Sequence, residues 1–189
     1  RKYQNEGGPG PAAIISLLRA NAAPIRPTAV NTAPINATPG ASAIINAATD
    51  IDAFIDALIL NWLIAGTDAH AKNYSVLIGA RGHVRLAPLY DIASILPYDE
   101  FDPRKVKLAM KIGDEYRLAQ IGISEWRKLA VAVKADPDAL IERVRSMAKR
   151  LPDLVMTEAR RAAGDGLTHP IVGKLAEAVI KRAEPFAAA

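Results

Sequence analysis

Apolar residues recur at helical spacing in the middle of the chain, most clearly between Thr49 and Ile64. Their side chains return every three or four positions, as on the buried face of a helix. They are Ile51, Phe54, Ile55, Leu58, Ile59 and Trp62. Thr49 followed by Asp52 fits a capping box, Asp50 would complement a helix N-terminus, and Gly66 is suited to ending a helix. The pattern therefore predicts a buried helix from Thr49 to about Ile64.

The hydrophobic pattern changes after this helix. Tyr74–Ile78 and His83–Leu86 are short β-rich runs joined by a glycine-containing turn, which predicts a β-hairpin. Four helices are expected from residue 124 onward. Their predicted starts are a Ser124 cap, an Asp136-Pro137 pair, Pro152 (with an end at Gly164) and Pro170. The expected fold class is mainly α with a small β-hairpin.

The first 48 residues have a different composition. Glycines and prolines at positions 7–11 predict turns before a short helix. Residues 20–48 consist almost wholly of Ala, Asn, Thr, Pro and Ile, and their four prolines exclude one long helix. We therefore expect a turn-rich segment and short helix over 1–19, an irregular low-complexity connection over 20–48, and a helical body with the hairpin over 49–189.

Composition narrows the class of protein. Half of the 189 residues are apolar and 23% are charged, as in ordinary globular domains. The absence of cysteine excludes disulfides and thiolate metal sites and suits a reducing cytoplasm. No apolar run approaches the ~18 residues of a membrane span. The net charge of +4 permits an acidic partner without arguing for one. Because Arg1 is not a methionine, we expect the chain to be the later part of a longer polypeptide.

The candidate chemistry lies between the predicted helix and the end of the hairpin. Asp68 and Asn73 have the Asp-x-x-x-x-Asn separation of a kinase catalytic loop, and Asp91 follows the hairpin. Phosphoryl transfer needs a carboxylate to accept the proton of the attacking hydroxyl, and an amide and a second carboxylate to hold Mg²⁺. Since a hairpin returns the chain to its starting point, Asp91 should lie beside Asn73.

A long motif surrounds these residues. It reads Asn61-Trp62-Leu63-Ile64-Ala65-Gly66-Thr67-Asp68-Ala69-His70-Ala71-Lys72-Asn73-Tyr74-Ser75, and then Arg85-Leu86-Ala87-Pro88-Leu89-Tyr90-Asp91. This run resembles the catalytic segment of the HipA-family serine/threonine kinases, the toxins of bacterial toxin–antitoxin pairs. Lys2-Tyr3 with Gly7-Gly8-Pro9, and Lys107-Leu108-Ala109-Met110, also resemble family segments. Gly66-Thr67 before Asp68 and Ile92-Ala93 after Asp91 depart from the ordinary protein-kinase pattern.

The resemblance implies a helical C-terminal lobe of a HipA/kinase-like fold, with ATP and Mg²⁺ as cofactors. It makes Asp68 the catalytic base and Asn73 and Asp91 the metal ligands. His70 and Lys72 would lie beside the nucleotide phosphates, with Tyr90 at the edge of the site. The glycine-rich loop and paired lysine of a kinase are not recognisable in the chain, and in the family both lie upstream. The isolated chain is therefore expected to bind ATP weakly and to transfer little phosphate.

The implied partners are a HipB-like helix-turn-helix antitoxin, DNA only through that antitoxin, and a protein substrate such as an aminoacyl-tRNA synthetase; no membrane is implied. Two alternatives stay open: a non-catalytic corepressor that binds the antitoxin, and a metal-dependent hydrolase with Asp68, His70 and Asp91 as ligands.

Each candidate site residue also has a structural interpretation. Asp68 could cap the turn after Gly66, His70 could be a hydrogen-bonded structural histidine, Lys72 a solvated charge, Tyr90 a packing residue, and the basic face of Arg143, Arg145, Lys149 and Arg150 a solvated helix surface rather than an antitoxin or DNA contact.

Overall fold

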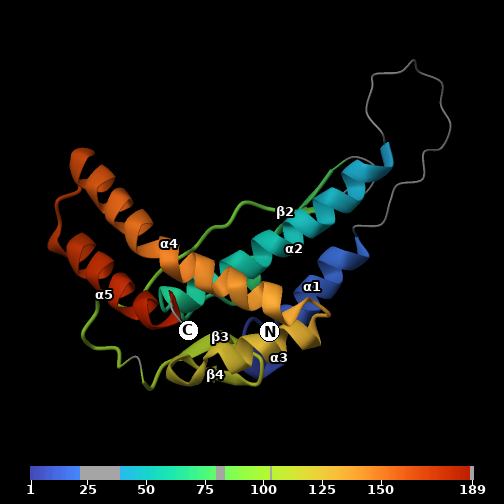
Figure 1. Cartoon of the computed structure of the whole chain (residues 1–189), viewed down its shortest axis with the longest axis horizontal. Helices are drawn as coiled ribbons and strands as arrows, with labels where there is room; N and C mark the ends of the chain where they lie inside the picture. Colours follow the sequence, from blue (N-terminus) through green and yellow to red (C-terminus); the bar gives the residue numbers. More distant parts are fainter. Residues whose placement is uncertain (22–38, 80–83, 103, 188–189) are drawn as a thin grey trace, which may run out of the picture.

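One long helix forms the centre of the fold, and the other elements pack around it (Figure 1). The structure is a computed structural model that describes residues 1–21, 39–79, 84–102 and 104–187, with only the helical backbone described over 39–47. The helices are α1 (Pro11–Ala20), α2 (Pro39–Leu63), α3 (Ile123–Ala132), α4 (Pro137–Gly164) and α5 (Pro170–Ala187), with short 3₁₀ turns η1 (Gln4–Glu6), η2 (Ala71–Asn73) and η4 (Leu118–Gln120).

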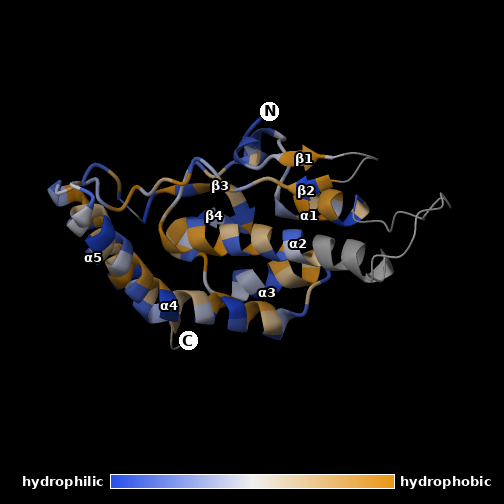
Figure 2. Cartoon of the chain, turned by 90° about the horizontal axis from the view of Figure 1, so that it is seen from above, coloured by the Kyte–Doolittle hydropathy of each residue, from blue (hydrophilic) through white to orange (hydrophobic). Residues whose placement is uncertain are grey.

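Two antiparallel hairpins complete the fold, β1 (Val76–Ile78) with β2 (Val84–Leu86) and β3 (Lys107–Ile112) with β4 (Glu115–Arg117). The mainly helical class is confirmed, and the first hairpin pairs as predicted, with Val76 opposite Leu86. Its turn, including His83, lies outside the described residues. The second hairpin was not predicted. Figure 2 shows the first hairpin and α1 on one side of α2, with α3 and α4 on the other.

The buried face of α2 is the predicted one. Phe54, Ile59 and Trp62 are fully buried, and Trp62 stacks edge-on against Trp126 of α3 at 5.5 Å between ring centroids. Arg182 of α5 donates hydrogen bonds of 3.2 and 3.1 Å to the Trp62 carbonyl oxygen at the end of α2. Burial lowers the pKa of Arg182 to about 10, and the guanidinium remains charged at neutral pH beside the negative end of the α2 dipole. The last turn of α2 is therefore fixed by α3 and α5.

The predicted start of this helix is wrong. The helix begins at Pro39, so residues 39–48 are helical rather than irregular, and Thr49 with Asp52 does not form its cap. Proline is well tolerated in the first turn, and the alanines that follow favour helix. Instead of complementing a helix start, Asp50 binds the first hairpin. Residues 22–38 of the predicted connection lie outside the described residues.

Two other predicted helix starts also need correction. Glu125 and Trp126 donate their backbone N–H groups to the Gly122 carbonyl, so α3 is capped by Gly122 and not by Ser124. Pro152 lies inside α4 instead of opening a third helix. Proline removes one helical hydrogen bond at a cost of about 3 kcal/mol. The helix nevertheless continues through Pro152 and packs against α5. The starts at Asp136-Pro137 and Pro170 are confirmed.

The predicted basic face divides into two parts. Arg143 links α4 to α2, because its guanidinium forms salt bridges with Asp56 at 2.9 Å and Asp52 at 3.0 Å. These carboxylates raise the pKa of Arg143. By contrast, Lys149 and Arg150 are exposed and Arg145 is half-buried. Within the described residues, no helix combines the length and apolar character needed to cross a bilayer.

Candidate active site

A tight turn after α2 presents the candidate catalytic loop. Ala65 takes a left-handed conformation (φ 54°), and Gly66 donates its N–H to the Asn61 carbonyl at 2.6 Å. A side chain at Gly66 would collide with the Asn61 amide and approach the Ala93 carbonyl oxygen to 3.1 Å. Glycine at position 66 therefore lets the Asn61 amide and the Ala93 carbonyl pack closely against the turn, and the turn brings Asp68 out of the core.

Asp68 is accessible and held by a residue from the start of the chain. Its side chain is 64% exposed. The Tyr3 hydroxyl donates to Asp68 Oδ1 at 2.9 Å, and His70 Nε2 lies 4.0 Å from Oδ2. One carboxylate oxygen is thus fixed by Tyr3, while the carboxylate as a whole stays open to a partner from solvent.

Asn73 links the two ends of the hairpin. Its side-chain amide donates to Asp91 Oδ2 at 2.8 Å and to the Asp68 carbonyl oxygen at 3.3 Å. Asn73 is buried, and Asp91 is exposed with a left-handed backbone (φ 56°). The expected juxtaposition of Asp91 with Asn73 is present. The roles of these residues as base and metal ligands stay predictions.

The segment after Asp91 is clamped to the end of α2. The Ser94 hydroxyl donates to the Ile64 carbonyl oxygen at 2.5 Å, and the Ile95 N–H donates to the Ala65 carbonyl oxygen at 3.4 Å. The loop on each side of the hairpin is therefore attached to the same helix end, which limits how far Asp91 and Asn73 can separate.

The first hairpin is anchored separately, through Asp50. The carboxylate of Asp50 accepts from Arg85 Nε at 2.9 Å and from the Leu86 N–H at 3.0 Å. The hydrogen bond with the Asp50 carboxylate raises the pKa of Arg85. The side chain of Asp50 is 8% exposed, whereas that of Arg85 is 45% exposed, so solvent weakens the charge interaction.

Replacing Asp50 by alanine should lower the free energy of unfolding by about 1–3 kcal/mol, because the Leu86 N–H then loses its acceptor in a partly buried setting. Urea denaturation measures this loss, and amide hydrogen exchange should report faster opening of β1 and β2. Asp99→Ala is the matched control, since Asp99 pairs with Lys174 but is 91% exposed. Equal effects of the two substitutions would contradict the anchoring role of Asp50.

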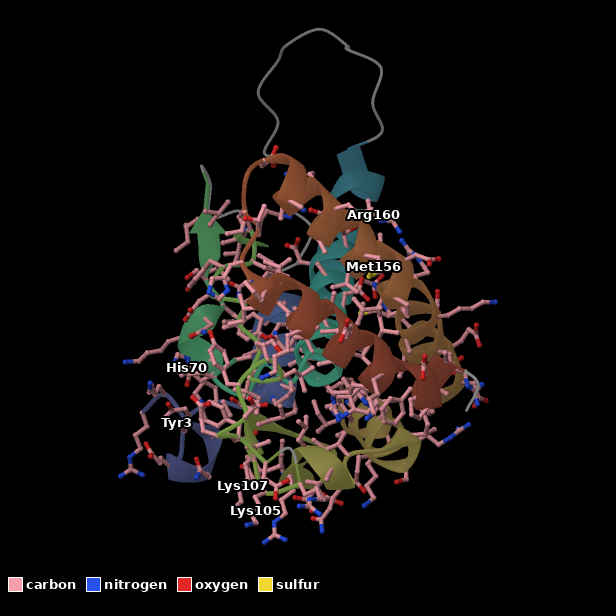
Figure 3. The ribbon with its side chains drawn as sticks, turned by 90° about the vertical axis from the view of Figure 1, so that its left-hand side faces the viewer. Tyr3, His70, Lys105, Lys107, Met156 and Arg160 are labelled. Atoms are coloured by element: carbon pink, nitrogen blue, oxygen red, sulfur yellow. The ribbon has the colours of Figure 1, made fainter. Side chains whose placement is uncertain are left out.

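The other predicted site residues differ in their surroundings. His70 is buried against the Tyr3 ring, at 5.4 Å between centroids, and its Nδ1 has no hydrogen-bond partner within the described part of the chain (Figure 3). Lys72 is exposed. The Tyr90 hydroxyl donates to the Lys72 carbonyl oxygen at 2.7 Å and lies 2.7 Å from the Ser75 hydroxyl. Tyr90 therefore supports the loop through hydrogen bonds of its hydroxyl.

Tyr3 is the site residue that sequence reasoning missed. The chain places it 65 positions before Asp68, and no local spacing connects the two. The available signal was the likeness of the Lys2-Tyr3 and Gly7-Gly8-Pro9 stretch to a family segment. That likeness marked the stretch as part of the motif without giving its contact.

The donor set at the hairpin ends suits a hard divalent cation. Asn73 and Asp91 offer an amide oxygen and a carboxylate, the oxygen ligands that Mg²⁺ prefers, and Mg²⁺ commonly takes few protein ligands with substrate phosphates. Over residues 1–21, 48–79, 84–102 and 104–187, no three His, Cys, Asp or Glu side chains gather as a metal would require. The Asp68–His70–Asp91 ligand set of the hydrolase alternative is thus not assembled.

Comparisons with known proteins place this geometry in context. A Sinorhizobium fredii protein named "Putative kinase Y4mE" is 33% identical over 129 residues, which cover 68% of this chain and 24% of that protein. The Shewanella oneidensis "Serine/threonine-protein kinase toxin HipA" is 29% identical over 97 residues, covering 51% of this chain and 22% of that protein. The chain spans about a quarter of the length of these curated relatives.

A solved structure has the same fold. It is the Shewanella oneidensis toxin–antitoxin complex of HipA, HipB and its operator DNA, matched with a TM-score of 0.66 at 19% identity over 94% of this chain and 36% of that one. The sequence model of the HipA-like C-terminal domain family matches residues 36–155, which contain Asp68, Asn73 and Asp91. Because that match spans more than half of the chain, the chain belongs to the HipA-like C-terminal domain family.

Proposed function

We propose that this chain is the catalytic-lobe part of a HipA-type serine/threonine protein kinase that uses ATP and Mg²⁺. The observation that carries the proposal is the Asn73 amide, which bonds to the Asp91 carboxylate and to the Asp68 backbone at once. Through these two hydrogen bonds Asn73 keeps Asp68 and Asp91 close to it, as a base and two metal ligands for phosphoryl transfer would need to be.

Each side chain has a defined part in this proposal. Asp68 accepts the proton of the attacking serine or threonine hydroxyl, and Tyr3 holds the carboxylate in orientation through Oδ1. Asn73 and Asp91 would hold Mg²⁺, which supplies charge neutralisation at the nucleotide phosphates. The exposed Lys72 is free to reach a phosphate, whereas buried His70 supports the loop against Tyr3.

The proposed setting is the toxin of a type II toxin–antitoxin pair in the cytoplasm. A HipB-like helix-turn-helix protein would restrain it, DNA would be contacted only through that protein, and the acceptor would be a translation component such as an aminoacyl-tRNA synthetase. Family membership supports these partners. The solved HipA complex contains HipB and operator DNA, which is a property of that protein.

The test is transfer of labelled γ-phosphate from ATP to protein by the whole native protein. Transfer should require Mg²⁺, stop on chelation with EDTA and return when Mg²⁺ is restored, because oxygen ligands alone hold the ion. Phosphoamino-acid analysis should find phosphoserine or phosphothreonine. Tight binding to a helix-turn-helix partner with no transfer under any metal condition would instead favour the non-catalytic corepressor.

A further inference from the structure

The second hairpin has a partly open edge. The Val106 carbonyl accepts from the Leu118 N–H at 3.0 Å and so faces β4, whereas the Lys111 N–H donates to Gln4 Oε1 at 2.9 Å and faces away. Both backbone groups of a residue in an antiparallel strand face one edge, and successive residues alternate. Val106 and Lys111 are five positions apart and face opposite edges of the strand. Lys107 pairs with Arg117 next to the Val106–Leu118 hydrogen bond and therefore directs its backbone groups to the outer edge, as Lys111 does. Between Lys107 and Ile112 the register with β4 shifts.

This outer edge adjoins the candidate base. A cavity of about 420 Å³ is bounded on one side by Thr67 and Asp68, and on the others by β3 and the N-terminal segment. Its remaining lining residues are Tyr3, Asn5, Glu6, Lys107, Leu108 and Ala109. Gln4 already occupies the edge at Lys111, and the cavity lies at the other end of the strand. The outward-facing backbone of Lys107 and the Asp68 carboxylate thus share one space.

We propose that this cavity is the acceptor site, where an extended segment of the protein substrate pairs with the outer edge of β3 and places its serine or threonine hydroxyl at Asp68. The inference rests on the proposed kinase function. An unpaired strand edge binds extended peptides through main-chain hydrogen bonds. In the reaction, the hydroxyl oxygen bonds to the γ-phosphorus, the bond to the ADP oxygen breaks with its electron pair, and the hydroxyl proton passes to Asp68.

Charge gives the acceptor segment a further feature. Within the described residues, Lys107 is the only cation lining the cavity, and its exposed ammonium makes no ion pair there. The neighbouring Lys105 lies outside the lining, 4.0 Å from Asp102. Figure 3 shows both lysines on the side of the molecule that carries Tyr3. Glu6 and Asp68 supply negative charge to the same lining, so an acidic residue of the acceptor segment would be attracted only where it lies against Lys107. Lys105 provides a matched control.

The experiment uses the whole native protein with Mg²⁺ and ATP, and a positional-scanning library of short peptides with a fixed serine. The best acceptor peptide is then resynthesised with single backbone N-methyl groups. Pairing with the edge at Lys107 predicts that N-methylation of the one peptide residue opposite Lys107 raises the acceptor KM about tenfold, with little effect at its neighbours. Lys107→Glu should raise the acceptor KM for an acidic peptide and leave the KM for ATP unchanged, whereas Lys105→Glu should change neither.

The outcomes separate the two proposals. Uniform sensitivity to N-methylation, or equal effects of Lys107→Glu and Lys105→Glu, would overturn the acceptor site while leaving the kinase in place. Phosphorylation of a protein acceptor with no transfer to any library peptide would also overturn it. Failure to transfer phosphate to protein, peptide or water would overturn the kinase function and this inference with it.

Discussion

Asp68→Asn should reduce γ-phosphate transfer by the native protein by about 10²–10⁴-fold, the usual contribution of a positioned general base. Asparagine keeps the shape of the side chain and can still accept the Tyr3 hydrogen bond. It cannot take up the proton of an attacking hydroxyl. The loss should therefore appear in kcat, with the KM for ATP nearly unchanged, and is measured by steady-state transfer of labelled phosphate.

A matched control is Asp99→Asn, which makes the same chemical change at another carboxylate. The Asp99 side chain is 91% exposed and pairs with Lys174 of α5. It should keep full activity. Thermal unfolding of both variants should match the unaltered protein, because the side chain of Asp68 is 64% exposed. Undiminished transfer by Asp68→Asn would remove Asp68 from the chemistry.

Asp91→Asn should shift the Mg²⁺ dependence of transfer to concentrations higher by about tenfold or more, by comparison with the 10–100-fold losses that follow changes at supporting residues of metal sites. The substituted amide can still accept from Asn73 through its oxygen, so the loop contact survives. The negative charge that would neutralise the cation does not. Activity should recover partly at high Mg²⁺, in contrast to Asp68→Asn.

Metal titrations of the two variants provide the decisive comparison. If Asp91 holds the ion, added Mg²⁺ rescues Asp91→Asn and has no effect on Asp68→Asn. A metal dependence identical to that of the unaltered protein in Asp91→Asn would show that the ion lies elsewhere. A loss of folded protein in urea denaturation would instead assign Asp91 to structure.

Local pattern was sufficient where side chains interact along one element or across one short hairpin. The three- and four-residue spacing identified the buried face of α2, and the β1–β2 hairpin explains why Asp91 returns to Asn73. Both features follow from the spacing of residues fewer than about twenty positions apart, although the α2 face itself packs against distant helices. Their geometry is fixed by helix and hairpin periodicity alone.

Long-range contacts account for most of what the sequence did not reveal. Tyr3 reaches Asp68 across 65 positions, and Asp50 serves Arg85 rather than a helix start. The second hairpin did leave a local signal, since Leu108, Met110 and Ile112 alternate before a turn at Gly113. Gly113 has φ 59° and lies so near the Glu125 backbone that a side chain would approach its carbonyl oxygen to 2.6 Å. Glycine is thus required there for conformational and steric reasons.

Asp91 occupies a conformation that an ordinary side chain avoids, with φ 56° and a cost of about 1–2 kcal/mol. Glycine would adopt the same angles without strain, so the backbone conformation by itself would favour glycine at this position. That exchange would delete both the acceptor for Asn73 and the carboxylate proposed for the cation. The backbone conformation and the proposed chemistry thus make opposing demands on residue 91, and a variant chosen only to relieve the strain would lack both the Asn73 contact and the carboxylate.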